Sequence, residues 1–374
     1  MQQVKWGKYK IEDLFSISNT LSFNSDVLVD GYEYDYITRT SFNQGILQTT
    51  GFVNKENINS AGNWSLGLLQ MDFFYRKKPW YAGQFVRKVI PKFELSDSAI
   101  LFFTTLLNRL KPTLSSVLVR DVDNTFLNST IQVPITVDGK IDFGFISEFV
   151  AELETQRVAE LATYLQVTGL DDYTMTAEEL KCINDFDHIN LCEFEIDSLF
   201  EKIKVKNLKY KTSELPDSAT LSNPLPALTA GIINQGLNNY VPLQGATILN
   251  NVISISANGA NTGATFFQSH DFTVLQDAYA IQWKDKDKIL SANSYLYFTG
   301  AISRAIYGNY EWTNKAGWER IKSDKISVPV TDDGIDIKYI DTLISALKKL
   351  VIKDVVMYAD KKISTTKEVI ASNK

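Results

Sequence analysis

The residues that most often carry chemistry are scarce in this chain. Its 374 residues include only two histidines, His188 and His270, and two cysteines, Cys182 and Cys192. One histidine and both cysteines lie within eleven residues and offer three zinc ligands, but closed structural zinc sites take four ligands and space their cysteines more tightly. We therefore expect two buried thiols, a surface imidazole and no metal site. Two cysteines are also too few for a disulfide scaffold, which agrees with a reducing compartment.

The motifs of enzymes that act on DNA or nucleotides are also missing. An adenine methyltransferase needs a glycine-rich cofactor loop and an Asn-Pro-Pro-aromatic turn, and in the nearest string, Ser222–Pro226, one proline is displaced. Gly259–Gly263 lacks the lysine of a phosphate-binding loop and is explained as a turn by glycine's tolerance of positive φ. Asp217 has no Glu-x-Lys at the distance that a metal-dependent nuclease requires. We therefore expect neither catalytic residues nor a cofactor in this chain.

A local concentration of positive charge remains. The stretch from Arg76 to Lys111 carries a net charge of +6, whereas the whole chain carries −6. Its basic residues alternate with aromatic residues between Phe73 and Tyr81, which suits a DNA-binding face because Lys and Arg neutralise phosphates while aromatic and amide groups reach groove edges. A weaker basic stretch lies between Lys202 and Lys211. A solvated basic surface explains the same composition equally well.

The elements that would position these residues come in two copies. Four segments recur in the same order: Tyr9–Phe15 with Phe194–Phe200, Tyr36–Gly45 with Ala227–Gly236, Leu101–Arg109 with Leu296–Arg304, and Ile131–Gly139 with Ile326–Gly334. The second pair shares a threonine and a complete Asn-Gln-Gly turn. The offset grows from 185 to 195 residues, as expected when loops lengthen between fixed elements. The matches therefore indicate an internal duplication.

Each copy predicts an α+β domain that ends in a long helix. Apolar and aromatic runs predict strands at Val27–Val29, Tyr34–Ile37, Ile253–Ser256 and Tyr279–Trp283, and a helix over Ile100–Leu110. Each copy closes with an apolar run, a proline, an Asp-Gly turn and a helical pattern, which predicts long helices from about Phe143 to Leu165 and from near Ile337. Thr176 followed by Glu179 forms a capping box that opens a short helix between the copies.

The two long helices each carry an apolar stripe that needs a partner. The economical partner is the other helix, which gives an antiparallel, coiled-coil-like pair between two globular ends. Alternatively, each helix caps its own domain. The first helix would be about 35 Å long at roughly 1.5 Å per residue, close to one turn of duplex DNA at about 34–36 Å. Such a spacer would let two domains read two short segments on one face of the duplex.

Several motifs together carry a family resemblance. An opening aromatic-x-Ile-x-x-Leu-Phe, a Thr-x-x-x-x-Asn-x-Gly, a Val-Pro strand with an Asp-Gly turn and a long helix, all repeated once, resemble the specificity (S) subunit of type I and BcgI-like restriction-modification systems. The resemblance covers essentially the whole chain, and Thr168–Thr176 is similar to the linker of that group.

This resemblance implies a noncatalytic DNA-recognition subunit. Two target recognition domains would each read half of a bipartite, asymmetric DNA site. The paired helices between them would dock an N6-adenine methyltransferase and, through it, a separate or fused nuclease. S-adenosylmethionine and Mg would then serve the partner subunits in DNA methylation and cleavage. The expected division is residues 1–141 and 191–335 for the two domains, 142–167 for the first spacer helix, 168–190 for the linker, and 336–374 for the second helix and tail.

Candidate contact residues follow from this resemblance, since Arg, Asn and Gln form bidentate pairs with guanine or adenine. DNA contacts are expected from Arg39, Thr40, Asn43, Gln44, Arg76, Lys77, Lys78, Trp80 and Arg109 in the first domain, and from Thr229, Asn234, Gln235, Asn258, Asn261, Thr262, Arg304, Tyr307 and Asn309 in the second. Partner contacts are expected from Ile146, Phe149, Leu153, Leu161, Ile340, Leu343 and Leu347. The Asn-Gln-Gly segments are equally explained as hairpin turns. Ala230 opposite Arg39 indicates that the domains have diverged, as two different half-sites require.

Two other functions fit the same sequence. A duplicated carbohydrate-binding or phage-type structural module would use the aromatic residues, which make up 12% of the chain, to stack on sugars. A nuclease with an unrecognised site would cleave DNA on its own. The sequence has no uninterrupted apolar run of about 18 residues and no apolar signal segment at its start, so we expect a cytoplasmic protein that does not enter membranes.

Overall fold

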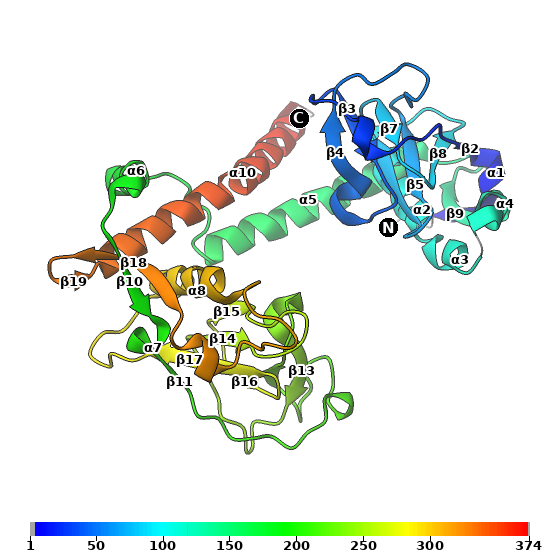
Figure 1. Ribbon diagram of the computed structural model, residues 1–374. Coiled ribbons are helices and arrows are strands. Elements are labelled where there is room, and N and C mark those ends of the chain that lie inside the picture. The colour runs from blue at the N-terminus through cyan, green and yellow to red at the C-terminus, as the bar shows by residue number, and fades with distance from the viewer. Residues whose placement is uncertain (1–3, 118, 373–374) are drawn as a thin grey trace. The chain divides into compact units, whose positions relative to one another are not determined.

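Two compact units make up the computed structural model, which describes residues 4–117 and 119–372 (Figure 1). One unit holds the chain up to Leu161 together with its end from Lys362 onward, and the other runs from Ala162 to Lys361. Each unit contains one copy of the repeated sequence. Within the described residues, no helix combines the length and apolarity needed to span a membrane.

The first copy is a mixed α+β domain. Its strands are β1 (Lys5–Lys10), β2 (Phe15–Asn19), β3 (Tyr34–Ile37), β4 (Ile46–Thr50), β5 (Asn63–Gly67), β6 (Asp72–Arg76), β7 (Trp80–Ala82), β8 (Val86–Pro91) and β9 (Thr130–Ile135). Its helices are α1 (Ile11–Leu14), α2 (Asp97–Asn108), α3 (Lys111–Ser115) and α4 (Val122–Asn128), with 3-10 turns η1 (Ser25–Val27), η2 (Phe42–Gly45) and η3 (Val119–Asp121). The strand predicted at Tyr34 and the helix predicted near Ile100 are confirmed.

The strand predicted at Val27–Val29 is wrong. Val27 ends the turn η1, and the following residues form no strand. The backbone N–H and C=O of Val29 both bond the Thr50 hydroxyl, at 3.1 and 2.8 Å. A side chain therefore satisfies the polar groups that a neighbouring strand would otherwise satisfy.

The second copy repeats these elements in the same order. Its strands are β10 (Leu191–Glu195), β11 (Phe200–Lys202), β12 (Leu225–Leu228), β13 (Leu237–Val241), β14 (Val252–Ser256), β15 (Thr265–Gln268), β16 (Thr273–Val274), β17 (Ala278–Trp283), β18 (Lys325–Thr331) and β19 (Gly334–Ile335). Its helices are α7 (Ile196–Leu199), α8 (Ala292–Ile306) and α9 (Trp318–Ile321), with 3-10 turns η5 (Thr212–Glu214) and η6 (Ile233–Gly236). Both strands predicted in this copy are confirmed.

Two of the sheets have the same strand order in both copies, and the third, β1-β9, gains the short strand β19 in the second copy. The order β2-β8-β5-β6 corresponds to β11-β17-β14-β15, and the order β4-β3-β7 corresponds to β13-β12-β16. In each three-stranded sheet the central strand has one antiparallel and one parallel neighbour. The register shifts after Tyr36 in one copy and after Ala227 in the other. The duplication predicted from the sequence is confirmed down to this irregularity.

The repeated opening motif supplies an aromatic centre for each core. The ring of Phe15 lies 5.7 Å from that of Trp64 and 5.8 Å from that of Phe103 on α2. The equivalent Phe200 meets Trp283 at 5.4 Å and Phe298 at 5.3 Å. Fully burying one such side chain is worth about 1.5–3 kcal/mol. The Leu-Phe of the motif thus recurs because its aromatic ring joins the sheet to the following helix.

Each copy is followed by a long helix, α5 (Phe143–Val167) and α10 (Ile337–Ser372). Both begin alike, since the carboxylates of Asp142 and Asp336 each accept a backbone N–H of the first turn at 2.9 Å. With 25 and 36 residues, the helices are about 37 and 54 Å long. Within the first unit, Lys362 of α10 lies 3.4 Å from the Glu154 carboxylate of α5, which joins the two helices there.

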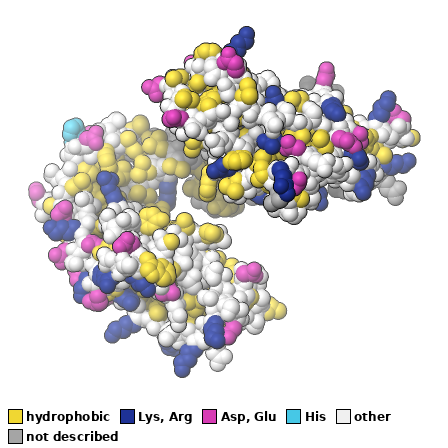
Figure 2. All heavy atoms as spheres, turned by 45° about the vertical axis from the view of Figure 1, so that its right-hand side comes forward, with side chains coloured by type: hydrophobic (Ala, Val, Ile, Leu, Met, Phe, Trp, Pro, Cys, Tyr) yellow, Lys and Arg dark blue, Asp and Glu magenta, His cyan; other side chains and the backbone are white. Residues whose placement is uncertain are grey.

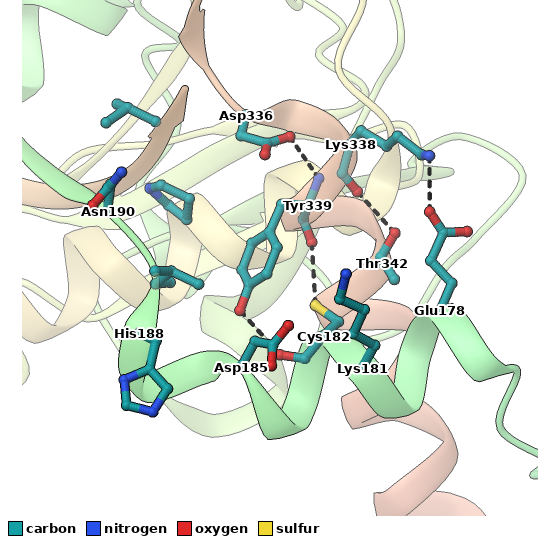
Figure 3. Close-up of a pocket in the computed structure, with 13 residues that line it drawn as sticks. Glu178, Lys181, Cys182, Asp185, His188, Asn190, Asp336, Lys338, Tyr339 and Thr342 are labelled. Carbon is teal, nitrogen blue, oxygen red and sulfur yellow. Dashed lines mark hydrogen bonds and ion pairs between the residues drawn. The ribbon is translucent and has the colours of Figure 1, made fainter. Parts of the chain in front are cut away.

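The segment between the copies contains α6 (Ala177–Asn184) and η4 (Phe186–His188), and α6 packs against the start of α10 (Figure 3). The predicted capping box of Thr176 and Glu179 is confirmed. The hydroxyl of Tyr339 donates to the Cys182 carbonyl at 3.1 Å, and the Cys182 thiol donates to the Tyr339 carbonyl at 3.9 Å. A second contact pairs Lys338 with Glu178 at 2.8 Å. The linker is therefore a folded part of the second unit.

A buried carboxylate completes this contact. Glu179 accepts hydrogen bonds from Ser345 at 2.6 Å and from Lys349 at 2.9 Å. Burial opposes its charge, but these bonds, the backbone N–H of Thr176 and the Lys349 charge outweigh burial and lower the pKa of Glu179 to about 2. A carboxylate paired in this way stabilises the folded state near neutral pH.

Candidate nucleic-acid interface

The most regular shared feature of the two domains is the Asn-Gln-Gly turn. Asn43 and Gln44 have φ of 46° and 54°, and Asn234 and Gln235 have φ of 48° and 57°. The glycine after each pair also has positive φ. Left-handed backbone costs most residues with a Cβ roughly 1–2 kcal/mol, whereas Asn tolerates it, so the glutamine of each turn is the disfavoured residue. The hairpin interpretation is confirmed, because η2 joins β3 to β4 and η6 joins β12 to β13.

A cleft lies beside each turn. The first cleft, of about 510 Å³, is lined by Asn24, Ser25, Tyr36, Thr38, Arg39, Thr40, Leu47, Leu69, Gln70, Gly83 and Gln84. The second cleft, of about 630 Å³, is lined by Asn207, Leu208, Lys209, Tyr210, Lys211, Thr212, Thr229, Ala230, Asn238, Leu275, Gln276 and Asp277. Residues on both sides of the turn contribute to the wall in each case.

The two clefts occupy equivalent places in the fold. The segment after β7 is fixed by a bond from the Gly83 N–H to the Ile37 carbonyl at 2.7 Å, and the Leu275 N–H bonds the Leu228 carbonyl at 2.8 Å. Thr38 and Thr229 each donate a backbone N–H to the glycine carbonyl of the turn, at 2.8 and 3.0 Å. The frame is thus shared, while the side chains that line it differ.

The charges of the clefts suit a polyanion that carries hydrogen-bonding edges. In the first cleft the lining is neutral apart from Arg39, whose guanidinium carbon lies 5.3 Å from the centre of the Phe85 ring. In the second cleft Lys209 and Lys211 outnumber Asp277. The contact of Arg39 with the Phe85 ring orients the guanidinium of Arg39 while leaving its N–H donors free for hydrogen bonding.

Charges of both signs are mixed on the face drawn in Figure 2, where Lys and Arg side chains lie interspersed with Asp and Glu side chains. Three of the eight basic residues from Arg76 to Lys111 are paired with carboxylates: Lys78 with Asp35, Arg87 with Asp123, and Lys111 with Asp72. The net charge of the stretch in the sequence therefore overstates the positive charge that the fold leaves unpaired there.

A pocket of about 540 Å³ next to α6 differs in character (Figure 3). Three acidic residues, Glu178, Asp185 and Asp336, line it together with Lys181 and Lys338. This balance does not suit a phosphate backbone. Within the described residues no three His, Cys, Asp or Glu side chains form a metal-binding group. Cys182 is buried, but Cys192 is exposed, so the expectation of two buried thiols is wrong for the second.

The predicted DNA contacts of the first domain differ in their position and exposure. Arg39 and Thr40 line the first cleft, and Asn43 and Gln44 lie exposed on the turn beside it. Lys77 and Arg109 are exposed, and Arg109 ends α2. Lys78 is half-buried and bonds the Tyr32 carbonyl at 3.0 Å as well as pairing with a carboxylate.

Arg76 and Trp80 are wrong as surface contacts. Arg76 is 2% exposed and donates to the Gln44 carbonyl at 2.5 Å. Burial lowers its pKa to about 10, although the Asp35 charge acts in the opposite direction. Trp80 is fully buried, with its indole N–H bonded to Asn63 at 3.2 Å. Both side chains point into the domain, so neither reaches DNA in this structure.

The second-domain candidates are also divided. Thr229 lines the second cleft, and Asn234 and Gln235 lie exposed on its turn. Asn258 and Asn261 are half-buried, and the amide of Asn258 donates to Asp277 at 2.7 Å. The other candidates, at and beyond the end of α8, are exposed: Arg304, Tyr307 and Asn309.

Thr262 is wrong as a DNA contact, because it is 2% exposed. Its hydroxyl oxygen accepts the backbone N–H of Ala316 at 2.9 Å. This bond ties the loop after β14 to the segment before α9. The residue therefore shapes the domain rather than its surface.

The helix candidates separate into core and surface residues. Ile146 and Ile340 are fully buried in the cores of their own domains, so the prediction of partner contacts is wrong for both. Leu343 is also buried, and Leu161 is half-buried. The three others remain open on the helix surfaces: Phe149 (43% exposed), Leu153 (43%) and Leu347 (41%).

Two exposed apolar residues were missed by the sequence analysis. Phe42 and Ile233 directly precede the Asn-Gln-Gly turns and are 85% and 78% exposed. The signal was present, because an apolar residue stands at the same place of a polar turn in both copies. Lys209 and Lys211 belonged to the weaker basic stretch, but only the fold brings them to the second cleft.

A comparison with known families finds two matched regions in the chain. The family model described as "Type I restriction modification DNA specificity domain" matches residues 3–163 and 190–357. An S subunit of a type I restriction-modification system from M. genitalium aligns over 100% of this chain and 96% of its own, at 12% identity and a TM-score of 0.54. The HsdS subunit from Thermoanaerobacter tengcongensis aligns over 95% and 91%, at 12% identity and a TM-score of 0.32. No curated protein matches the chain.

The repeated α+β domains, each with a cleft beside a rigid turn, define a duplicated recognition module. This chain belongs to the type I restriction modification DNA specificity family, with two such domains in one polypeptide. It is a noncatalytic specificity subunit that recognises DNA as part of a restriction-modification complex.

Proposed function

We propose that each domain reads one half of a bipartite DNA site through its cleft and the adjoining turn. The observation that carries this proposal is that the turn has the same left-handed backbone in both domains, while the side chains in the clefts differ. Two different half-sites require this combination of a shared frame and different contacts. Arg39 in one cleft stands where the other has Ala230.

The chemistry of each cleft indicates the mode of reading. An exposed arginine offers bidentate bonds to guanine, and the amides of Asn43 and Gln44 can pair with adenine. In the second domain the lysines supply phosphate contacts and the turn amides supply base contacts. We therefore expect guanine recognition through Arg39 to be specific to the first half-site.

The long helices are proposed to form an antiparallel pair that docks the partner subunits. The contact between Glu154 and Lys362 supports the pairing, and each helix has exposed apolar side chains of its own, Phe149 and Leu153 on α5 and Leu347 on α10. The partners would be an N6-adenine methyltransferase and a nuclease, separate or fused, which would bind S-adenosylmethionine and Mg themselves. In this proposal the complex works in the cytoplasm, where it meets DNA.

Binding by the assembled complex tests the cleft assignment. Replacing Arg39→Ala should weaken binding by about tenfold or more and relax specificity at one base pair of one half-site. Replacing Lys211→Ala should weaken binding to all sequences similarly and reduce the salt slope by about one. Lys140→Ala, an exposed lysine outside the clefts, is the control. Equal losses for Arg39→Ala and Lys140→Ala would contradict the assignment.

A further inference from the structure

The backbone of the turns requires support. Three residues in a row, Asn43, Gln44 and Gly45, have positive φ, and Gly45 has φ of 79°. The equivalent three residues of the second copy do the same. Asn and Gly tolerate this region, but the glutamine between them does not, so its conformation carries a cost that its surroundings must offset. Residues held in such conformations persist when their surroundings fix them.

In the first domain an arginine supplies that support. The Nη2 of Arg76 donates to the Gln44 carbonyl at 2.5 Å and to the Ser65 hydroxyl at 2.6 Å. Its Nε donates to the same hydroxyl at 2.9 Å. Ser65 in turn donates to the Phe74 carbonyl at 3.5 Å. A chain of bonds thus runs from the sheet edge to the middle of the turn.

In the second domain a glutamine supplies the same support. Gln268 occupies the place of Arg76, since each is the last residue of its strand and pairs with the first residue of the neighbouring strand. Its Nε2 donates to the Gln235 carbonyl at 3.3 Å and to the Ser254 hydroxyl at 3.0 Å. Ser254 donates to the Phe266 carbonyl at 3.4 Å. Both residues therefore bond the turn carbonyl and the serine hydroxyl, and Arg76 adds one further bond to its serine.

We propose that Arg76 and Gln268 are positioning residues for DNA recognition, which act by holding the carbonyl of the second turn residue. We call each set, Arg76 with Ser65 and Gln268 with Ser254, a turn bracket. The inference rests on the proposed function, because it assigns the turns to the DNA-reading surface. The bracket fixes the backbone from the inner side, so that the turn's side chains are presented rigidly on the outer side.

A comparison of the two brackets shows which property of Arg76 the turn requires. The turn carbonyl needs one N–H donor, which an amide supplies as well as a guanidinium does. The positive charge of Arg76 is thus not essential to the bracket, although its second N–H adds a bond to Ser65. Arg76→Gln should therefore preserve the turn, whereas Arg76→Met should not.

The test uses the full chain assembled with its methyltransferase, after the recognised site has been found by sequencing methylated adenines. Binding is then measured to duplexes altered in either half-site. Arg76→Met should reduce discrimination about tenfold at the first half-site only, and Gln268→Met at the second only. Arg76→Gln should restore discrimination. Arg87→Met, which removes an arginine from β8 of the same sheet without touching the turn, should leave both half-sites unchanged.

Amide hydrogen exchange of the same variants supplies a readout that does not depend on DNA. Exchange should rise in residues 38–46 for Arg76→Met and in residues 229–237 for Gln268→Met, and stay at the wild-type level for Arg76→Gln. The half-buried Gln268 keeps the test valid if Arg76→Met fails to fold. Unchanged exchange in Gln268→Met, or Arg76→Gln behaving like Arg76→Met, would overturn the proposal.

A variant with an intact bracket separates this inference from the proposed function. Gln44→Ala removes a turn side chain but leaves the backbone carbonyl that the bracket holds. If Gln44→Ala leaves discrimination intact, the DNA-reading role of the turn is wrong. If Gln44→Ala lowers discrimination while both methionine variants do not, the DNA-reading role stands and the bracket is wrong.

Discussion

Phe42 and Ile233 stand at the tips of the two turns with most of their surface open to solvent. Apolar side chains in this position can contact the C5-methyl group of thymine or wedge against a base step. Phe42→Ala and Ile233→Ala should each weaken specific binding of the complex by about tenfold, since burying such a side chain is worth about 1.5–3 kcal/mol. Titration of the recognised duplex measures the loss. Val137→Ala, 94% exposed outside the clefts, should change nothing, and an equal loss there would refute the contact.

Gly45 is required by both the conformation and the space around it. Its φ is 79°, and an added Cβ would lie 3.3 Å from the Thr38 carbonyl oxygen and 3.3 Å from the Arg76 guanidinium. Gly139 has the same φ with nothing within 4 Å. Gly139→Ala should therefore cost only about 1–2 kcal/mol of stability, and Gly45→Ala should cost more and also weaken DNA binding. Denaturation curves and binding of both variants provide the check, and equal behaviour would contradict it.

The burial and the partners of individual side chains could not be predicted from the sequence. The alternation of basic and aromatic residues around Arg76 and Trp80 resembled a DNA-binding face. Both side chains are buried, so they do not belong to such a face. No local sequence pattern predicts that Arg76 donates a hydrogen bond to the carbonyl of Gln44, which lies 32 residues away in the sequence. The turn itself was predictable, because Asn-Gln-Gly occurs twice in a duplicated context.

At the scale of the elements, the start of α6 is determined by neighbouring residues, whereas its packing depends on residues far away in the sequence. The Thr176–Glu179 capping box predicted its start, since the box needs only residues three apart. Its packing against α10 depends on Tyr339, Ser345 and Lys349, which lie more than 150 residues away in sequence. The strand expected at Val27 failed for the same reason, because Thr50 bonds the backbone of Val29.

The buried carboxylate on α6 predicts an acid-sensitive contact. The folded-state pKa of Glu179, about 2, lies below its ordinary value, so its stabilisation is present above about pH 4.5 and is lost as the pH falls toward 2. Glu179→Gln should lower the free energy of unfolding by roughly 1–3 kcal/mol at pH 7. The difference from wild type should shrink in acid. Chemical denaturation across this pH range measures it.

The neighbouring Glu178 is a matched control for that measurement. Its side chain is 63% exposed and pairs with Lys338 at the surface. Exposed pairs contribute about 0–1 kcal/mol, so Glu178→Gln should have little effect at any pH. A pH-independent loss in Glu179→Gln, or the same loss in Glu178→Gln, would show that the pairing of Glu179 is not what stabilises the contact.

At the scale of the whole molecule, the internal duplication predicted the architecture better than the composition did. The net charge of −6 gives no indication of DNA binding, and three of the eight basic residues in the local basic stretch are paired with carboxylates of their own domain. The order of four degenerate motifs nevertheless predicted two similar domains with long helices, because a duplicated fold repeats every element that builds its core. The clefts could not be predicted in this way, since each is assembled from loops of several strands.

The central claim is that two separate domains each read one half of the DNA site. Replacing residues 1–135 with the equivalent domain of another family member, and sequencing the methylated adenines in cells that also carry the methyltransferase, tests it most directly. The account predicts that one half of the methylated site changes while the other half stays the same. A change in both halves, or in neither, would contradict it.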